Sequence, residues 1–205
     1  MINRYSSIGG VMKGFFKHYS YNVVKNLVNQ FAISVFGAFL SMATTAASND
    51  KLSVAVSIFA IIFYLFLVYT TTWEIGAKDR VSFDVGKKPY RPHTGLLVGL
   101  VSNIPNLLIA LSFVFLKIPA LPDKFVGTSD FLLRLVSMVF QGMYAGLLMT
   151  IKVSADGTTL LKTWWAYFII IIPALVASWL AYYTGFKNFR LIAPLFDKKN
   201  KNKKK

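Results

Sequence analysis

Four long apolar blocks dominate the chain and predict helices that cross a membrane. They cover residues 27–48, 54–75, 95–116 and 164–185. A helix rises 1.5 Å per residue, so about 20 apolar residues cross the roughly 30 Å hydrocarbon core of a bilayer, and each block is that long. A surface helix of a soluble domain would carry a polar face over such a length. The pattern therefore predicts an all-α integral membrane protein.

A fifth apolar segment, residues 131–151, is ambiguous. It contains Arg134 and Gln141, yet its last 17 residues carry no charge and reach the lower limit for a spanning helix. Two topologies are compatible with this segment. Either the chain has four transmembrane helices plus one re-entrant or interfacial helix, or it has five transmembrane helices.

Basic residues distinguish these topologies because lysine and arginine concentrate in cytoplasmic loops. The segment before the first block, the loop after the second and the tail after the last hold four, five and eight of them, together 17 of the 23. These three regions share one side of the membrane only if residues 131–151 do not cross it. We therefore predict four spans, a re-entrant or interfacial fifth segment, and both termini in the cytoplasm.

The same pattern divides the chain into three parts. Residues 1–26 form a basic N-terminal segment, 27–186 a single transmembrane bundle with a cytoplasmic basic loop at 76–94, and 187–205 a disordered basic cytoplasmic tail. In the N-terminal part, apolar residues recur three to four apart, at Ile8, Val11, Met12, Phe15, Phe16, Tyr19, Val23 and Leu27. This spacing fits an amphipathic helix on the inner leaflet, or equally a cytoplasmic extension of the first span.

The third block contains the most unusual intramembrane sequence of the chain, Ser102-Asn103-Ile104-Pro105-Asn106. Proline removes a backbone donor and clashes with the carbonyl four residues earlier, so Pro105 should break the helix. Asparagines are costly in lipid, so Asn103 and Asn106 should face the bundle or water. Pro173 interrupts the last block at a similar depth. The two breaks together are a candidate site for a ligand or partner.

Two further sets of residues are candidates for binding. Arg134 either extends to the lipid headgroups or binds an anion with Gln141, one to two turns away. In the loop after the second block, residues of both charge signs offer a surface for lipid headgroups or for a partner protein: Glu74, Lys78, Asp79 and Arg80.

Small and aromatic residues indicate how the helices pack and where they meet the membrane surface. Small residues recur four apart in several blocks, which favours close packing within the chain or an interface between copies of it: Gly37, Ser41 and Thr45, Gly95 and Gly99, Gly142 and Gly146, Ala174 and Ser178. Aromatic residues near the block ends predict a belt at the headgroup level: Trp73, Trp164, Trp165, Trp179, Tyr182 and Tyr183.

Composition argues against an enzyme. The chain has no cysteine and only two histidines, and it contains no HExxH, GxSxG, P-loop or GxGxxG motif. We therefore expect no catalytic residue, no bound metal and no cofactor. The net charge of +15 is explained by basic segments facing anionic lipid, so nucleic acid is not expected as a partner.

Three short strings resemble a group of small integral membrane proteins of Gram-positive bacteria that have about 200 residues and no assigned function. They are Gly76-Ala77-Lys78-Asp79-Arg80, the stretch from residue 95 to Pro105, and Tyr183-Thr184-Gly185-Phe186-Lys187. The resemblance implies a multi-pass protein of the bacterial cytoplasmic membrane and carries no activity.

These observations leave three functional hypotheses. The first is a non-enzymatic accessory subunit or assembly factor of a membrane complex. The second is a small transporter or channel with its site around Asn103, Pro105 and Asn106. The third is an insertase-like factor that uses Arg134 and the basic tail. The expected partners are anionic lipids on the cytoplasmic side, and either another protein or a second copy of the chain.

Overall fold

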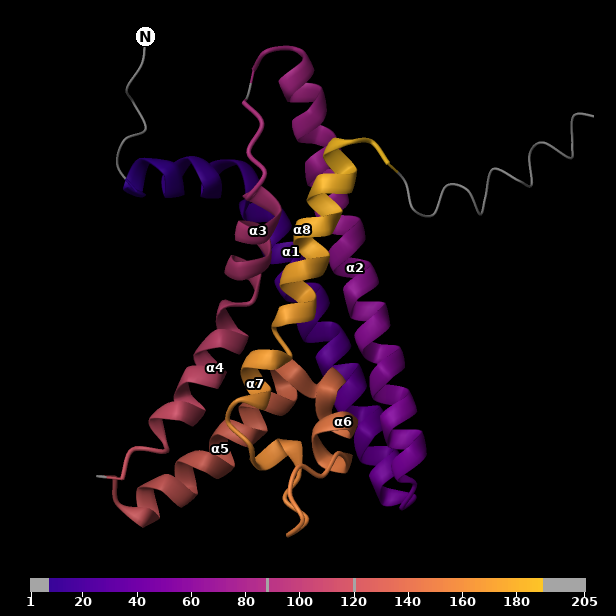
Figure 1. Cartoon of the computed structure of the whole chain (residues 1–205), viewed down its shortest axis with the longest axis vertical. Coiled ribbons are helices and arrows are strands. Elements are labelled where there is room, and N and C mark those ends of the chain that lie inside the picture. Colours follow the sequence, from indigo (N-terminus) through magenta and orange to yellow (C-terminus); the bar gives the residue numbers. More distant parts are fainter. Residues whose placement is uncertain (1–7, 88, 120, 190–205) are drawn as a thin grey trace, which may run out of the picture.

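The computed structural model describes residues 8–87, 89–119 and 121–189, and most of these residues are helical. The elements are α1 (Ile8–Ala46), α2 (Asp50–Asp84), α3 (Thr94–Ser102), α4 (Ile104–Phe115), α5 (Asp123–Gln141), η1 (Gly142–Tyr144), α6 (Ala145–Thr150), η2 (Leu160–Lys162), α7 (Ala166–Ile169) and α8 (Ile172–Phe186) (Figure 1). The predicted all-α class is confirmed.

The helices are long and apolar enough for a multi-pass membrane protein. Among the described residues, four segments meet that criterion: Met12–Ala46, Asp50–Asp84, Asp123–Thr150 and Ala166–Phe186. A fifth candidate is the pair α3 and α4, which meet at an angle of 59°. The third apolar block is therefore a broken span, as its proline predicted.

The bundle has two distinct ends. The basic end is where α2 stops, α3 begins and α8 stops; the hairpin end carries the turn closed by the antiparallel bridge between Lys152 and Thr159. In Figure 1, α1 and α2 run along the long axis between these ends, α8 runs beside them from the middle of the bundle to the basic end, and α3 with α4 makes another passage.

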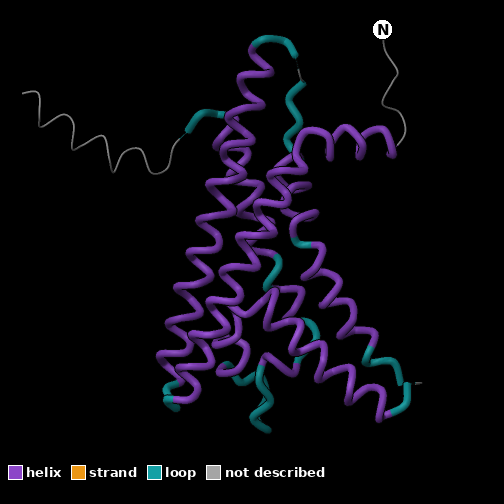
Figure 2. Tube along the Cα trace, turned by 180° about the vertical axis from the view of Figure 1, so that it is seen from behind, coloured by secondary structure: helices purple, strands orange, loops and turns teal. Residues whose placement is uncertain are grey.

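The segment from α5 to α6 enters the bundle and returns. In Figures 1 and 2, α5 starts at the hairpin end, the η1 turn lies inside the bundle, and α6 leads back to the hairpin end. The contacts agree: the Phe140 carbonyl accepts hydrogen bonds from Gln30 and Ser34 midway along α1, whereas Gly146 packs on Ser53 at the start of α2. Four crossings plus a re-entrant segment, as the charge pattern predicted, therefore describe this fold.

The N-terminal part of α1 lies across the bundle axis at the basic end, although α1 is one continuous helix (Figures 1 and 2). Phe15 and Val23 are buried here against Ile75, Val98 and Tyr182, while Met12 and Phe16 on the same apolar stripe are exposed. The helix thus combines both predicted forms. Its N-terminal part lies across the bundle axis, and the same helix continues without a break into the first span. Of the predicted basic tail, residues 190–205 fall outside the described residues.

Close approach of the helices depends on small residues within the chain. A Cβ atom on Gly37 would lie 2.5 Å from Met143 Cα, and one on Gly99 would lie 2.9 Å from the Ser178 side chain. Gly142 is pressed in the same way against Ser34 and Ala38. The predicted packing role of these residues is therefore confirmed inside one chain.

Two sequence predictions at the basic end need correction. Helix α2 continues to Asp84, so residues 76–84 of the predicted loop are helical, and the described irregular parts are 85–87 and 89–93. The helix stops where Gly86 adopts a φ of +70°, a conformation that glycine tolerates. Tyr182 does not belong to an aromatic belt, because it is only 1% exposed and packs in the core.

Candidate functional site in the centre of the bundle

The break between α3 and α4 is built by Asn103 and Pro105. Pro105 occupies the first turn of α4, where a helix needs no backbone donor. Asn103 ends α3, and its side-chain Nδ2 donates to the Gly99 carbonyl at 2.9 Å. Ser102 donates to the Val98 carbonyl at 2.8 Å. The Gly99 carbonyl also accepts from the Asn103 backbone N–H at 3.1 Å, so the polar side chains at the break bond to the last turn of α3 and do not face lipid unpaired.

Polar side chains from three helices gather at this break. Asn106 Nδ2 donates to Asn103 Oδ1 at 3.0 Å, and the Tyr64 hydroxyl lies close to the Asn103 side chain. Tyr64 also donates a long hydrogen bond of 3.4 Å to Gln30 Oε1. Both asparagines, Tyr64 and Gln30 are each no more than 2% exposed. We call these four residues, together with Gln141 and Tyr144, the central polar cluster.

The tip of the re-entrant segment supplies the other two members. Gln141 follows Phe140, whose carbonyl accepts from Gln30 at 3.2 Å, and Tyr144 lies in the η1 turn near Tyr64. Gln141 is 1% and Tyr144 4% exposed. A helix break and a re-entrant tip thus place their polar groups in the same region.

Several atoms of the central polar cluster have unused hydrogen-bonding capacity. Asn106 Oδ1, both polar atoms of the Gln141 amide and the Tyr144 hydroxyl have no hydrogen-bond partner within the described residues. Buried polar groups at membrane depth are costly unless protein, water or a ligand satisfies them. The cluster offers donors and acceptors but no charged group, so it suits a small, neutral, hydrogen-bonding molecule.

Pro173 makes the second predicted break. It lies in the first turn of α8, after the short helix α7. Helix α7 packs on the far part of α4, where the Phe113 and Tyr167 rings stack at 4.2 Å. In the next residues of α8, Leu175 and Ser178 pack on Gly99 of α3, so the second break lies at a depth similar to that of the first, as predicted.

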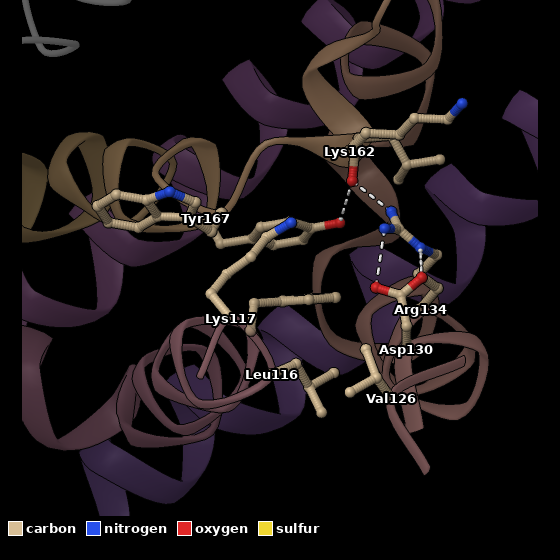
Figure 3. Close-up of a pocket in the computed structure, with 10 residues that line it drawn as sticks. Leu116, Lys117, Val126, Asp130, Arg134, Lys162 and Tyr167 are labelled. Carbon is tan, nitrogen blue, oxygen red and sulfur yellow. Dashed lines mark hydrogen bonds and ion pairs between the residues drawn. The ribbon is translucent and has the colours of Figure 1, made fainter. Parts of the chain in front are cut away.

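Arg134 lies on α5, where an ion pair with Asp130 that was not predicted from the sequence holds it. Its Nε and Nη2 donate to the two carboxylate oxygens of Asp130 at 2.7 and 2.9 Å, and its Nη1 donates to the Leu161 carbonyl (Figure 3). The guanidinium carbon is also 5.6 Å from the centre of the Phe113 ring. These contacts include no bond to Gln141, which lies in the central polar cluster instead.

The predicted charged surface at the basic end divides into two parts. Lys78, Glu74 and Arg80 are exposed, and their ion pairs are a 3.9 Å contact of Glu74 with Lys25 and a 2.9 Å contact of Arg80 with Asp84. A cavity of about 450 Å³ lies beside Arg80, between the ends of α2 and α8. This exposed part fits the predicted role in headgroup or partner contact.

Asp79 does not belong to that surface, because it is only 8% exposed. Its Oδ2 accepts hydrogen bonds from the Tyr19 hydroxyl at 2.6 Å and from the Tyr182 hydroxyl at 3.1 Å. Tyr19 belongs to α1 and Tyr182 to α8, so the Asp79 carboxylate joins three helices at the basic end. The prediction of Asp79 as a surface contact was wrong, because α2 continues as a helix and turns this residue inward.

Four residues of these sites were not predicted from the sequence: Gln30, Tyr64, Tyr144 and Asp130. Asp130 could have been found, because an acid four residues before an arginine is the helical spacing for an ion pair. Gln30 is a polar residue inside the first apolar block, and it lies four residues after Asn26, which puts both amides on one helix face. Tyr64 and Tyr144 lie in continuous apolar sequence and give no such signal.

Among the described residues, no group of three or more histidine, aspartate or glutamate side chains comes together to hold a metal ion. No family model, curated protein or solved structure matches this chain. Inferences about its function therefore depend on the geometry of the central polar cluster and of the two ends of the bundle.

Proposed function

We propose that the protein is a small transporter or channel for a neutral, hydrogen-bonding solute. The observation that carries this proposal is the central polar cluster: polar side chains with unused hydrogen-bonding capacity, buried at a helix break and a re-entrant tip. Interrupted helices at membrane depth are where transporters and channels place binding sites, because their freed polar groups can bind a substrate. A protein that served only as an anchor would have no use for them.

The two ends of the bundle favour a closed state of such a site. At the basic end the Tyr19–Asp79–Tyr182 hydrogen bonds join α1, α2 and α8. At the hairpin end the Arg134 side chain ties α5 to the Leu161 carbonyl, which also accepts from the Tyr167 hydroxyl at 3.0 Å. A solute reaching the central polar cluster would require one of these connections to open.

The proposal is tested by the permeability of proteoliposomes to glycerol and urea, measured by stopped-flow light scattering. The wild-type protein is expected to accelerate the flux of at least one of these solutes. Asn106→Leu and Gln141→Leu keep the approximate volume and remove the polar groups, so each should lower the added flux at least about tenfold, which corresponds to the loss of about one hydrogen bond.

The matched control is Thr72→Val. The Thr72 hydroxyl is also buried and without a partner within the described residues, but it lies on α2 two turns beyond Tyr64. Its replacement should leave the flux unchanged. Equal flux from wild type, Asn106→Leu and Gln141→Leu, with all proteins folded, would contradict the proposal.

The basic end is proposed to face the cytoplasm of a bacterial cell, because lysine and arginine are enriched in cytoplasmic loops. The chain contains no cysteine, so single cysteines report their side of the membrane. With a membrane-impermeant maleimide, Ser129→Cys and Ser154→Cys should react in intact cells, whereas Lys87→Cys should react only after the membrane is opened. Reaction of Ser129→Cys and Ser154→Cys from opposite sides would exclude the re-entrant topology.

A partner-binding role as an accessory subunit is the second candidate, and one observation favours it. Helix α2 has 35 residues and is about 52 Å long, so it projects well beyond a hydrocarbon core of roughly 30 Å. On this projection Val81 is 65% and Phe83 44% exposed. Exposed apolar side chains outside the membrane are typical of partner surfaces. Substitutions of Val81 and Phe83 would impair this function, whereas those at Asn106 would impair transport.

A further inference from the structure

A second cavity lies at the hairpin end, apart from the central polar cluster. Its volume is about 50 Å³. Its walls come from the end of α4, from α5, and from the chain between η2 and α7, so the site depends on the tertiary fold (Figure 3). The charged residues that line it are Lys117, Asp130, Arg134 and Lys162. Three cations and one carboxylate give the cavity a net charge of +2 at neutral pH.

Arg134 is fixed in this cavity before any ligand arrives. Three of its N–H groups are used by Asp130 and by the Leu161 carbonyl, and the Phe113 ring supports the guanidinium. A guanidinium has five N–H donors, so two remain for an oxyanion. Because the side chain is already ordered, binding costs little conformational entropy.

The lysines provide the net positive charge and the rest of the wall is apolar. Both lysines line the cavity, and in Figure 3 the Lys162 ammonium points away from Arg134. Phe113, Leu116 and Val126 supply apolar surface. The exposed Trp164, also at the cavity, suits the headgroup level of a membrane.

A free anion needs the cationic groups but has no use for the apolar wall. A phospholipid uses both, because its phosphate bears the negative charge and its glycerol and acyl groups are apolar. We propose that this cavity binds the phosphate group of a phospholipid at the hairpin end of the bundle. The proposal does not rest on solute transport, although Arg134 also makes the hairpin-end connection to the Leu161 carbonyl.

The test measures the melting temperature of the full-length protein in neutral detergent with three probes. These are dihexanoyl-phosphatidylglycerol, dihexanoylglycerol without the phosphate, and inorganic phosphate. The phospholipid should raise the melting temperature saturably, by about 3–6 °C at ten times its dissociation constant. The other two probes should leave it unchanged at the same concentrations.

The variants separate this cavity from the general positive charge of the chain. Lys117→Gln/Lys162→Gln should raise the dissociation constant at least about tenfold, because it removes both lysines of the cavity. The control Lys124→Gln/Lys152→Gln removes the same charge from exposed positions at the same end, outside the cavity, and should bind as wild type does. Arg134 is left intact because its loss would leave Asp130 without its ion pair.

Three results would overturn the proposal. One is no shift of the wild-type protein with the phospholipid. The second is equal loss of binding in the cavity variant and the control variant. The third is an equal shift with dihexanoylglycerol, which would show that the phosphate does not contribute. An equal shift with inorganic phosphate, lost only in the cavity variant, would support the oxyanion site and identify free phosphate as its ligand in place of lipid.

Discussion

Replacing Gly185 by alanine is expected to unfold the basic end of the bundle. A Cβ atom at this position would collide with the backbone carbonyl of Trp73 on α2 and lie 3.0 Å from the carbonyl carbon of the same residue. Gly76 faces the other side of this crossing, where a Cβ would collide with the Tyr182 carbonyl and lie 2.8 Å from the Phe186 nitrogen. Backbone atoms cannot move aside as a flexible side chain can, so α2 and α8 would have to separate.

The expected cost of Gly185→Ala or Gly76→Ala is about 3 kcal/mol, at the upper end of the range for overpacking a core. In a chain of this size, that loss lowers the melting temperature by roughly 6–12 °C. Differential scanning fluorimetry of the purified protein measures it, since the four tryptophans report unfolding.

Gly127→Ala is the matched control. Gly127 lies in α5, and a Cβ atom at this position would have no neighbouring atom within 4 Å, so alanine adds a methyl group in open space. Alanine is the better helix former by about 1 kcal/mol, and the melting temperature should stay the same or rise slightly. If the Gly185→Ala and Gly127→Ala proteins had the same melting temperature, the close crossing of α2 and α8 would be contradicted.

The strings that resembled Gram-positive membrane proteins converge on this same crossing. Gly76 begins the first string, Gly185 is central to the third, and Gly95 in the second packs on Ser178 and Tyr182 of α8. Their glycines therefore allow three helices to approach closely at the basic end. The sequence signalled that these positions were special, but which helices they would join depended on the fold.

The path of the helices through the bundle could be predicted from length and charge because both reflect one-dimensional constraints, whereas the side of the membrane that each end faces stays a prediction. The bilayer thickness sets the length of a span, and the lysine and arginine bias sets its side. The break at Pro105 was also readable, because proline acts on its own helix. What the sequence could not provide was which polar groups meet across helices, such as Tyr64 with Asn103, because that depends on how each helix is rotated.

Asp79 shows why the candidate site was only partly predictable. Its neighbours Lys78 and Arg80 are exposed and charged, and local composition therefore suggested a surface loop. The helical spacing continues, however: Thr72, Ile75 and Asp79 are all buried on one face of α2. Extending the helical periodicity beyond the apolar block would have placed this carboxylate inside the bundle.

The second prediction with a large expected effect concerns the hydrogen bonds to the Asp79 carboxylate. Tyr19→Phe removes the 2.6 Å hydrogen bond that holds the N-terminal part of α1 against the bundle. Hydrogen bonds to charged groups contribute about 1.5–3 kcal/mol, so this variant should lose a stability in that range. Asp79→Leu should cost more, because the Tyr182 hydroxyl, in a residue only 1% exposed, loses the same acceptor.

The location of the loss distinguishes this connection from general destabilisation. Hydrogen exchange followed by mass spectrometry should show faster exchange in residues 12–22 of the Tyr19→Phe protein, with little change in α4 and α5. Tyr21→Phe is the control, since Tyr21 is two residues away on the same helix and is 75% exposed. Equal exchange in the two variants would mean that Tyr19 does not hold this part of α1. Faster exchange in Tyr19→Phe alone would show that the Asp79 carboxylate is what fastens this helix across the basic end, the connection that must open for a solute to pass from that side.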